Sequence, residues 1–372
     1  MEPITATTIT IKTRSAVKTV PVKTVPVKTV FAAEIDIKND LAARLTTPVL
    51  SQIFLSFILF LFALVASNTA FAKAPRKKLI AITQIVEHPS LEQAKRGILD
   101  ELKNNGYEIG VNLKVIEKSA QGSIANSAMI AKKFVSLSPD AIVAISTPSA
   151  QSVLKIARKA GLPVVFSSVT DPVAAGLVKD LSSPVNGVTG AMDYPLIDEG
   201  VALIQTLLPK AKTIGFLYNV GEANSVKTVN LMKKAMDGKF KYIDAQLANS
   251  NQIVQAVSAL VGRVDAVYIP SDNMVFSAMP KLIQLSRKHK LPIFSSDPDS
   301  VRSGVVACIG YSQYAVGKVA GKLLVRVLAG EREIAIEKPS KAEIFVNKKS
   351  AYIMNIEIPS EILGIKTNIV GK

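Results

Sequence analysis

One local pattern constrains the fold most: a short apolar run ends in a polar turn, and a helical pattern follows. It occurs five times, with apolar runs at residues 142–145, 164–166, 214–218, 267–270 and 292–294. Strands that alternate with helices in this way form parallel sheets with helices on both faces. Ligands of such sheets lie just outside the carboxyl ends of the strands. Because hydroxyl, amide and carboxylate side chains follow the runs, we predict that the chain recognises a small polar molecule.

The order of these patterns indicates two lobes. A first series of strands and helices begins at residues 79–85, and a polar gap at 182–186 precedes an apolar run at 188–192 that we expect to cross to a second series. We expect the run at 305–309 and a final long helix to return to the first lobe. The prediction is an α/β fold with two doubly wound parallel-sheet lobes joined by a multi-strand hinge, which suits closure on a ligand. The expected boundaries are 78–190 plus 297–328 for lobe I, and 191–296 plus 329–359 for lobe II.

The region before the first strand indicates export. Residues 53–66 are almost wholly apolar and precede Ala70-Phe71-Ala72, which has the small-x-small form of a cleavage site. We therefore expect residues 41–72 to be a signal peptide and the mature chain to be periplasmic, with cleavage after Ala72. The alternative is an uncleaved anchor in the inner membrane, because the apolar run extends back to Val49 and is then nearly long enough to span.

Residues 1–40 differ from the rest of the chain. Val-Lys-Thr-Val-Pro repeats between residues 17 and 30 make this segment low-complexity sequence that we do not expect to pack. A signal peptide normally begins close to its charged segment, so we expect translation to start near Leu41. On that expectation, residues 1–40 are either not native or disordered.

Composition excludes several classes of function. Cys308 is the only cysteine, which excludes an intramolecular disulfide framework and a cysteine-based zinc site. The formal net charge is +16, but Lys and Arg are spread along helical faces without a DNA-binding or base-stacking pattern, so we expect no nucleic-acid partner. His88 and His289 are the only histidines, and no Gly-x-Ser-x-Gly elbow, phosphate loop or dinucleotide turn is present. We therefore expect no catalytic residues, no metal and no cofactor.

The polar strand ends suit a small zwitterion such as an amino acid. The carboxylate of such a ligand suits the free N–H groups of a helix that opens near Ser149, and Thr147 and Thr170 add further hydroxyl donors. The ammonium needs acceptors, and acids stand on the strand-end loops at Asp171, Asp193, Asp272 and Asp297. So many acids with so few cations argue against phosphate or sulfate as the ligand.

Most of these residues have structural alternatives that the sequence leaves open. Ser149, Asn224 and Ser225 can cap the helices that follow them, and Asp171 precedes a proline and can simply form a turn. Four aromatic residues can line a side-chain pocket or belong to the core: Tyr194, Phe166, Phe276 and Tyr311. The full set of expected ligand-binding residues is Glu87, Thr147, Ser149, Gln151, Thr170, Asp171, Asp193, Tyr194, Asn219, Asn224, Ser225, Asp272, Asn273 and Asp297.

Six motifs, in a family's order, carry a resemblance. They are ITQIVEHP at 82–89, STPSAQ at 146–151, SVTDPV at 168–173, YNVGEANS at 218–225, PSDN at 270–273 and SDPDSV at 296–301. Through them the chain from about Leu79 to Asn355 resembles the substrate-binding proteins of bacterial ABC importers. More narrowly, it is similar to the tryptophan- and tyrosine-type binding proteins with a type I periplasmic fold.

The resemblance implies a function for the whole chain. It implies a periplasmic protein that captures an amino acid, with an aromatic one favoured, between two lobes. The loaded form would then deliver the ligand to a membrane permease that works with a separate ATPase. We expect a monomer. A ligand-sensing regulatory or receptor-associated module of the same fold is the alternative, and a membrane-anchored binding protein is a further one.

Overall fold

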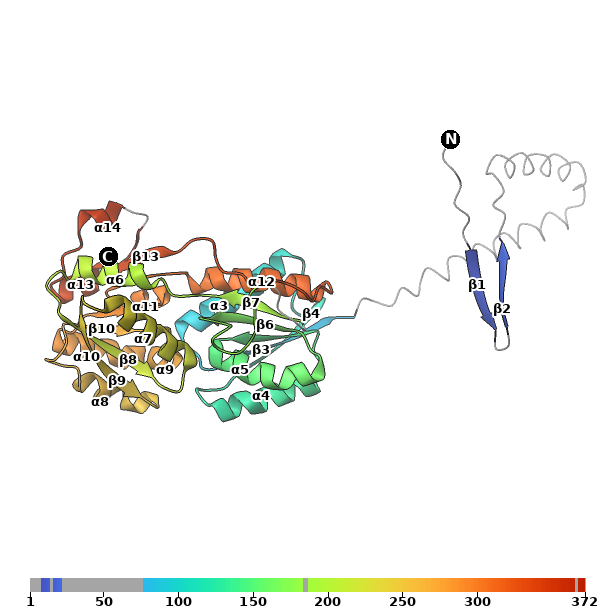
Figure 1. Ribbon diagram of the computed structural model, residues 1–372, viewed down its shortest axis with the longest axis horizontal. Coiled ribbons are helices and arrows are strands. Elements are labelled where there is room, and N and C mark those ends of the chain that lie inside the picture. The colour runs from blue at the N-terminus through green and yellow to red at the C-terminus, as the bar shows by residue number, and fades with distance from the viewer. Residues whose placement is uncertain (1–7, 14–15, 22–75, 183–186, 365–366, 372) are drawn as a thin grey trace, which may run out of the picture. The chain divides into compact units, whose positions relative to one another are not determined.

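The computed structural model describes residues 8–13, 16–21, 76–182, 187–364 and 367–371. The chain divides into two compact units, Met1–Ala74 and Pro75–Lys372. Within the first unit, β1 (Thr8–Thr13) pairs antiparallel with β2 (Ala16–Pro21) in a hairpin (Figure 1). The predicted signal peptide lies outside the described residues. Among the helices that are described, none is both long and apolar enough to cross a membrane.

The first sheet of the second unit has five parallel strands in the order β4-β3-β5-β6-β7. The strands are β3 (Lys78–Gln84), β4 (Leu113–Ser119), β5 (Ala141–Ile145), β6 (Val164–Val169) and β7 (Val188–Met192). All residues of β5 and β6 are buried, as expected for apolar runs in a sheet that is covered on both faces. The covering helices are α3 (Pro89–Asn104), α4 (Ile124–Ser136), α5 (Thr147–Ala157, continued by η1, Arg158–Ala160) and α12 (Gln313–Leu328).

The second sheet has seven strands in the order β14-β13-β12-β11-β10-β8-β9. All neighbouring pairs are parallel except β12 with β13. The strands are β8 (Thr213–Asn219), β9 (Lys241–Leu247), β10 (Ala266–Ile269), β11 (Ile293–Ser295), β12 (Ala307–Gly310), β13 (Glu343–Asn347) and β14 (Thr367–Val370). The helices are α6 (Ile197–Leu207), α7 (Ala223–Met236), η2 (Ser250–Gln252), α8 (Ile253–Ser258), α9 (Asn273–Ser277), α10 (Met279–His289), α11 (Pro298–Ser303), α13 (Lys348–Ile353) and α14 (Ser360–Gly364).

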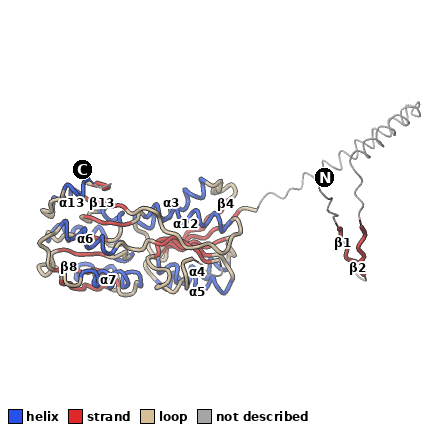
Figure 2. The backbone as a smooth tube through the Cα atoms, turned by 45° about the horizontal axis from the view of Figure 1, so that its top comes forward, coloured by secondary structure: helices blue, strands red, loops and turns tan. Residues whose placement is uncertain are grey.

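Helices lie on both faces of the sheets (Figure 2), and each sheet has an apolar core on both of its faces. In the first sheet, Val143 and Ile145 pack on one face with α3 and α12, whereas Ile142 and Ala144 pack on the other with α4 and α5. This division follows from the alternation of side chains along a strand. The two sheets and their helices form two lobes, which we call the first and the second lobe.

The two long helices of the first lobe pack unusually closely. A Cβ atom on Gly317 of α12 would collide with the backbone oxygen of Ala94 in α3, and one on Gly97 of α3 would collide with that of Tyr314. Glycine at both positions therefore permits the backbones to approach. The contact anchors α12, the last long helix of the chain, in the core of the first lobe.

One strand lies in a different lobe from the one expected. The run at 305–309 was predicted to return to the first lobe, but β12 pairs parallel with β11 and antiparallel with β13 in the second sheet. The reason is the short α11, whose six residues and Gly304, with a φ of 129°, carry the chain back to the neighbouring position in the same sheet. The chain therefore crosses between lobes after β7, after β12 and after α12. The exact lobe boundaries stay a prediction.

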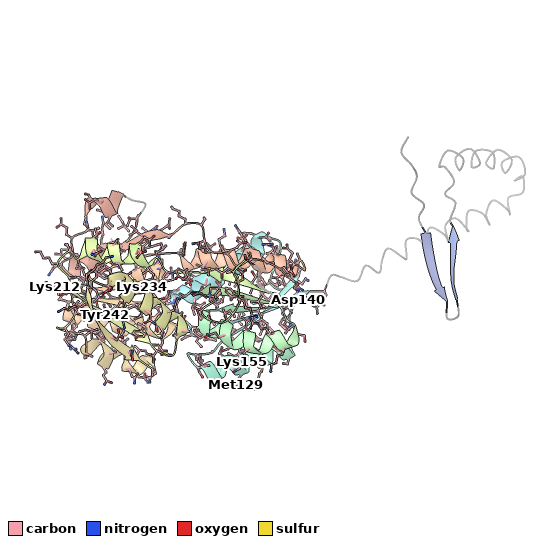
Figure 3. The ribbon with its side chains drawn as sticks, in the orientation of Figure 1. Met129, Asp140, Lys155, Lys212, Lys234 and Tyr242 are labelled. Carbon is pink, nitrogen blue, oxygen red and sulfur yellow. The ribbon has the colours of Figure 1, made fainter. Side chains whose placement is uncertain are left out.

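Basic residues are spread over the surface of the second unit, in line with the sequence pattern. Lys155 lies on the first lobe, whereas Lys212 and Lys234 lie on separate parts of the second (Figure 3). All three are exposed.

Candidate ligand-binding site

A pocket lies between the two lobes, at the carboxyl ends of strands from both sheets. Residues from both lobes and from the crossings line it: His88, Ser90, Leu91, Ser168, Thr170, Asp193, Asn224, Ser271, Asn273, Phe276, Asp297 and Gln313. Its volume is about 20 Å³, which is room for about one water molecule. We call this pocket the cleft. None of its lining residues is Lys or Arg.

Contacts across the cleft hold the lobes together. His88, just before α3, lies 3.3 Å through Nε2 from Oδ1 of Asn273 at the start of α9, and its ring packs edge-to-face on Phe276 with centroids 5.7 Å apart. At the rim, Nζ of Lys227 in α7 lies 3.7 Å from a carboxylate oxygen of Asp171. The structure is therefore that of the closed protein.

Three acceptor atoms in the cleft have no hydrogen-bond partner. They are Oδ1 of Asp193, Oδ1 of Asn224 and Nδ1 of His88. The three residues are 8%, 5% and 6% exposed, so water does not compensate these atoms freely. A buried polar atom without a partner costs free energy, and several in one cavity indicate groups that a ligand satisfies.

Hydrogen bonds made by the other polar atoms of Asp193 and Asn224 determine how these two side chains are oriented. Gln313 Nε2 donates to Asp193 Oδ2 at 2.8 Å, while Gln313 Oε1 accepts from the hydroxyl of Ser168 at 2.7 Å. Asn224 Nδ2 donates to the backbone oxygen of Ser271 at 2.6 Å. These bonds leave Oδ1 of Asp193 and Oδ1 of Asn224 as the atoms without partners.

The electrostatics of the cleft favour a cation. Burial raises the pKa of Asp193, and it raises the pKa of Asp297 to about 7 with help from neighbouring Asp299 and Asp193. Burial lowers the pKa of His88 to about 4, so the ring is neutral at physiological pH. A ligand cation would interact favourably with both carboxylates and would return their pKa values toward the ordinary range.

Five of the predicted residues line the cleft, and the others do not. The five are Thr170, Asp193, Asn224, Asn273 and Asp297. Asp272 instead accepts from the backbone N–H groups of Asn219 at 2.6 Å and Val275 at 2.9 Å, and it caps α9. Burial together with Glu222 raises the pKa of Asp272 to about 8. Its place in the structure is that of a buried link between β8 and α9.

Asp171 takes the structural alternative that the sequence left open. Its carboxylate accepts from the backbone N–H groups of Val173 at 3.1 Å and Ala174 at 2.9 Å, which makes it a turn former. Gln151 donates to the backbone oxygen of Ala175 at 3.1 Å and so supports the same loop.

The start of α5 does not line the cleft. Thr147 and Ser149 are buried, and the N-cap of this helix is Ser146 rather than Ser149. Ser146 has a φ of 89°, a strained value for a residue with a side chain, and such strain gathers at functional sites. In the second lobe, Asn219 accepts from the N–H of Gly221 at 2.8 Å, and Ser225 is fully buried behind Asn224.

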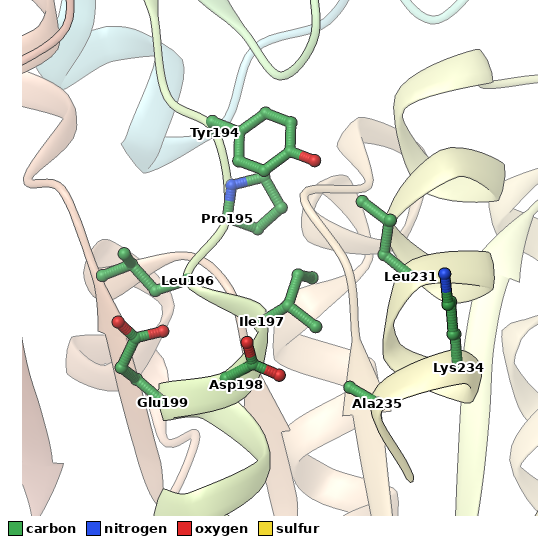
Figure 4. Close-up of a pocket in the computed structure, with 9 residues that line it drawn as sticks. All are labelled: Tyr194, Pro195, Leu196, Ile197, Asp198, Glu199, Leu231, Lys234 and Ala235. Carbon is green, nitrogen blue, oxygen red and sulfur yellow. The ribbon is translucent and has the colours of Figure 1, made fainter. Parts of the chain in front are cut away.

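Glu87 and Tyr194 line other hollows. Glu87 borders a pocket of about 100 Å³ beside β3 and β4. Tyr194 borders a groove of about 540 Å³ that Asp198 and Lys234 also line, with residues of α6 on one side and α7 on the other (Figure 4).

Sequence reasoning missed several residues that line the cleft: His88, Ser90, Leu91, Ser168, Ser271 and Gln313. His88 and Ser168 belong to motifs that the sequence analysis singled out, so the signal lay within one or two residues of the chosen positions. Phe276 was one of the aromatic candidates. The signal for Gln313 was its place three residues after the end of β12, at the first position of α12, which the mistaken lobe assignment of that strand obscured.

Comparisons with known proteins agree with this geometry. A family model described as ABC transporter substrate binding protein matches residues 79–370. The chain is 38% identical over 285 residues to the tyrosine-binding protein of Clostridioides difficile, covering 76% of this chain and 82% of that protein.

Two solved structures are also similar. The ABC domain from Streptococcus pneumonia in complex with L-Trp has a TM-score of 0.75 at 32% identity, covering 79% of this chain and all of that one (100%). The ligand-free, open structure of a substrate binding protein with adhesive properties from Clostridium difficile has a TM-score of 0.59 at 35% identity, covering 79% of this chain and 99% of that one. Because the identities are similar, the difference in TM-score fits a lobe arrangement nearer to the L-Trp complex than to the open structure. The predicted type I periplasmic fold is confirmed.

Proposed function

We propose that this chain, which belongs to the family of ABC transporter substrate-binding proteins, captures a free amino acid between its lobes and presents it to a membrane permease. Members of this family bind a small-molecule ligand and work with a permease and an ATPase. Ligand capture is the step that the cleft serves. No bond in the ligand needs to break.

The observation that carries the proposal is the set of three partnerless acceptors in the cleft. A primary ammonium has three N–H donors, and the cleft offers three acceptors in Asp193, Asn224 and His88. One of them is a carboxylate, so the ammonium also gains a charge partner. A sugar or a phosphate matches this set less well, because neither brings a positive charge to an acidic cleft.

The remainder of an amino acid also finds suitable partners. The hydroxyl of Thr170 lines the cleft and can donate to a carboxylate. Phe276 supplies an aromatic wall. The relatives named for tyrosine and for an L-Trp complex support an aromatic amino acid as the ligand.

The cleft as it stands holds about 20 Å³, so entry of an aromatic amino acid requires the lobes to open and the side chains of the cleft to rearrange. Contacts such as His88 with Asn273 exist only while the lobes are together. A ligand that touches both lobes therefore favours the closed state by its differential affinity. The permease would then recognise the closed, loaded protein.

Export is part of the proposal. The family is typically exported, and the apolar run at 53–66 followed by Ala70-Phe71-Ala72 supports cleavage after Ala72. Amino-terminal sequencing of the protein from its native envelope tests this, and retention of residues 53–66 would favour an anchored form.

Calorimetry with the unliganded mature protein tests the ligand class. We expect saturable binding of L-tyrosine or L-tryptophan, and binding at least roughly tenfold weaker for the analogues that lack the ammonium, 3-(4-hydroxyphenyl)propionate and 3-indolepropionate. Equal affinity for the amino acids and these analogues would refute the role of the three acceptors. If no amino acid binds, the ligand class itself is wrong.

A further inference from the structure

Glu222 lies behind the cleft and contacts the two amides that face it. The residue is 5% exposed and does not line the cleft itself. Its Oε2 accepts from Asn273 Nδ2 at 2.5 Å and from Asn224 Nδ2 at 3.2 Å. Oε2 also accepts from the backbone N–H of Asn273 at 3.2 Å, and Oε1 accepts from that of Met274 at 3.0 Å. One buried side chain therefore contacts the amides of both Asn224 and Asn273.

The contact with Asn273 determines which atom of that amide faces the first lobe. Because Asn273 Nδ2 donates to Glu222, Oδ1 is the atom directed at His88. An amide oxygen only accepts, so His88 must carry its ring proton on Nε2. The other nitrogen, Nδ1, then presents a lone pair and has no partner in the protein.

The contact between Glu222 and Asn224 likewise favours an orientation in which the amide oxygen is left free. Asn224 Nδ2 is shared between Glu222 and the backbone oxygen of Ser271. The amide oxygen of Asn224 is therefore the atom left without a partner. Glu222 thus contributes to the orientation of two of the three free acceptors, Asn224 directly and His88 through Asn273.

We propose that Glu222 is a positioning residue for ligand binding: it orients the amides of Asn224 and Asn273 and, through Asn273, fixes the ring tautomer of His88 across the closed cleft. The proposal rests on the proposed function, because the acceptors that result are those assigned to the ligand ammonium. The ring tautomer is fixed only when the lobes meet, since Glu222 and Asn273 belong to the second lobe and His88 to the first.

A carboxylate suits this role better than a neutral side chain. All four groups that contact the Glu222 carboxyl are N–H donors, so its oxygens act as acceptors, whereas a glutamine in its place also has two N–H donors. Glutamine would direct its NH₂ group at an amide or at a backbone N–H, and an amide that turned to accept would expose its own NH₂ to the cleft or to His88. His88 would then receive a proton donor at Nε2 and carry its proton on Nδ1, which repels an ammonium.

The ring tautomer of His88 can be observed directly. His88 and His289 are the only histidines, so ¹⁵N-histidine labelling gives two ring spectra, and His289→Gln removes the second. The ¹⁵N shifts at neutral pH distinguish a proton on Nε2 from one on Nδ1. We expect Nε2–H in the wild type saturated with L-tryptophan, and a gain of Nδ1–H in Glu222→Gln. The spectrum is recorded without L-tryptophan as well.

Affinity for L-tryptophan is the second readout, with a fall of roughly 10- to 100-fold expected in Glu222→Gln, because a charged ligand loses an acceptor and meets a donor. Asn273→Ala removes the amide that connects Glu222 to His88 and leaves Glu222 unchanged. It should also allow His88 to carry its proton on Nδ1, so it tests the inference even if Glu222→Gln does not fold. Glu333→Gln, at an exposed glutamate between α12 and β13, is the matched control and should change neither readout.

The outcomes separate this inference from the proposed function. An Nδ1–H or averaged ring in the wild type under both conditions overturns the positioning role, and so does an unchanged Nε2–H ring in both Glu222→Gln and Asn273→Ala. A changed tautomer with unchanged affinity also overturns it. If no amino acid binds to the wild type while Glu222 still sets the tautomer, the proposed ligand class fails and the orientation of the amides stands.

Discussion

Replacing Asp193 by asparagine is predicted to abolish tight binding without harming the fold. Gln313 Oε1 is occupied by the hydroxyl of Ser168, so Gln313 Nε2 must donate to position 193. The new amide oxygen therefore turns toward Gln313, and the new NH₂ group takes the place of the free Oδ1 in the cleft. The ligand ammonium would lose a buried charge partner and face a donor.

The magnitude follows from the burial of this site. Breaking one partner of a buried, hydrogen-bonded charge pair costs about 2–5 kcal/mol of binding free energy. At about 1.4 kcal/mol per tenfold change, the Kd for L-tyrosine or L-tryptophan should rise roughly 30- to 4,000-fold. Calorimetry measures this change, and Asp198→Asn, an exposed aspartate five residues along the same segment, should leave the Kd unchanged.

Although Asp193→Asn should weaken ligand binding, it should not lower the stability of the ligand-free protein. Burial raises the pKa of Asp193 in the folded protein, so the folded state binds this proton more tightly than the unfolded chain does. The ionised carboxylate then costs stability above the unfolded pKa of about 3.9. Asp193→Asn should therefore melt at an equal or higher temperature at pH 7, and this advantage should shrink as the pH falls through the folded pKa. Weak binding together with a clearly lower melting temperature would refute the reasoning.

Three further predictions concern the rim, the pH response and the core. Asp171→Ala should raise the Kd by less than about fivefold, and mainly at low salt, because its partner Lys227 is partly exposed and such pairs are screened. A roughly hundredfold rise in the Kd would instead make Asp171 a ligand contact. The closed state holds His88 with a pKa lowered to about 4, so closure is favoured above about pH 6.5 and should be lost as the pH falls toward 4; scattering measurements of His88→Gln should show a shallower dependence, and an equal slope would exclude the ring. Gly317→Ala should lower the free energy of unfolding by about 1–3 kcal/mol, because its Cβ meets α3, whereas Gly200→Ala, with open space around it, should be neutral or stabilising in the same denaturant titration.

The fold was predicted largely from local patterns. Runs such as those of β5 and β6 are short, apolar and followed by polar turns, which is enough to predict a buried parallel strand. The strand at β12 has the same local character, and its lobe could not be predicted in this way. Its partner strands β11 and β13 decide the lobe, and strand pairing is a contact between distant parts of the chain.

The candidate site was also predicted only in part, because local sequence gives the positions of polar residues but not their partners. Sequence alone determined that acids and hydroxyls stand at strand ends, because the positions after apolar runs can be read directly, and Asp193, Asn224 and Asp297 do line the cleft. Only the tertiary structure showed that the carboxylate of Asp272 accepts from two backbone N–H groups and that the carboxylate of Asp171 stabilises a turn. Whether a buried carboxylate is free for a ligand depends on which donors the fold brings within about 3 Å of it, and those donors come from segments that the local sequence does not identify.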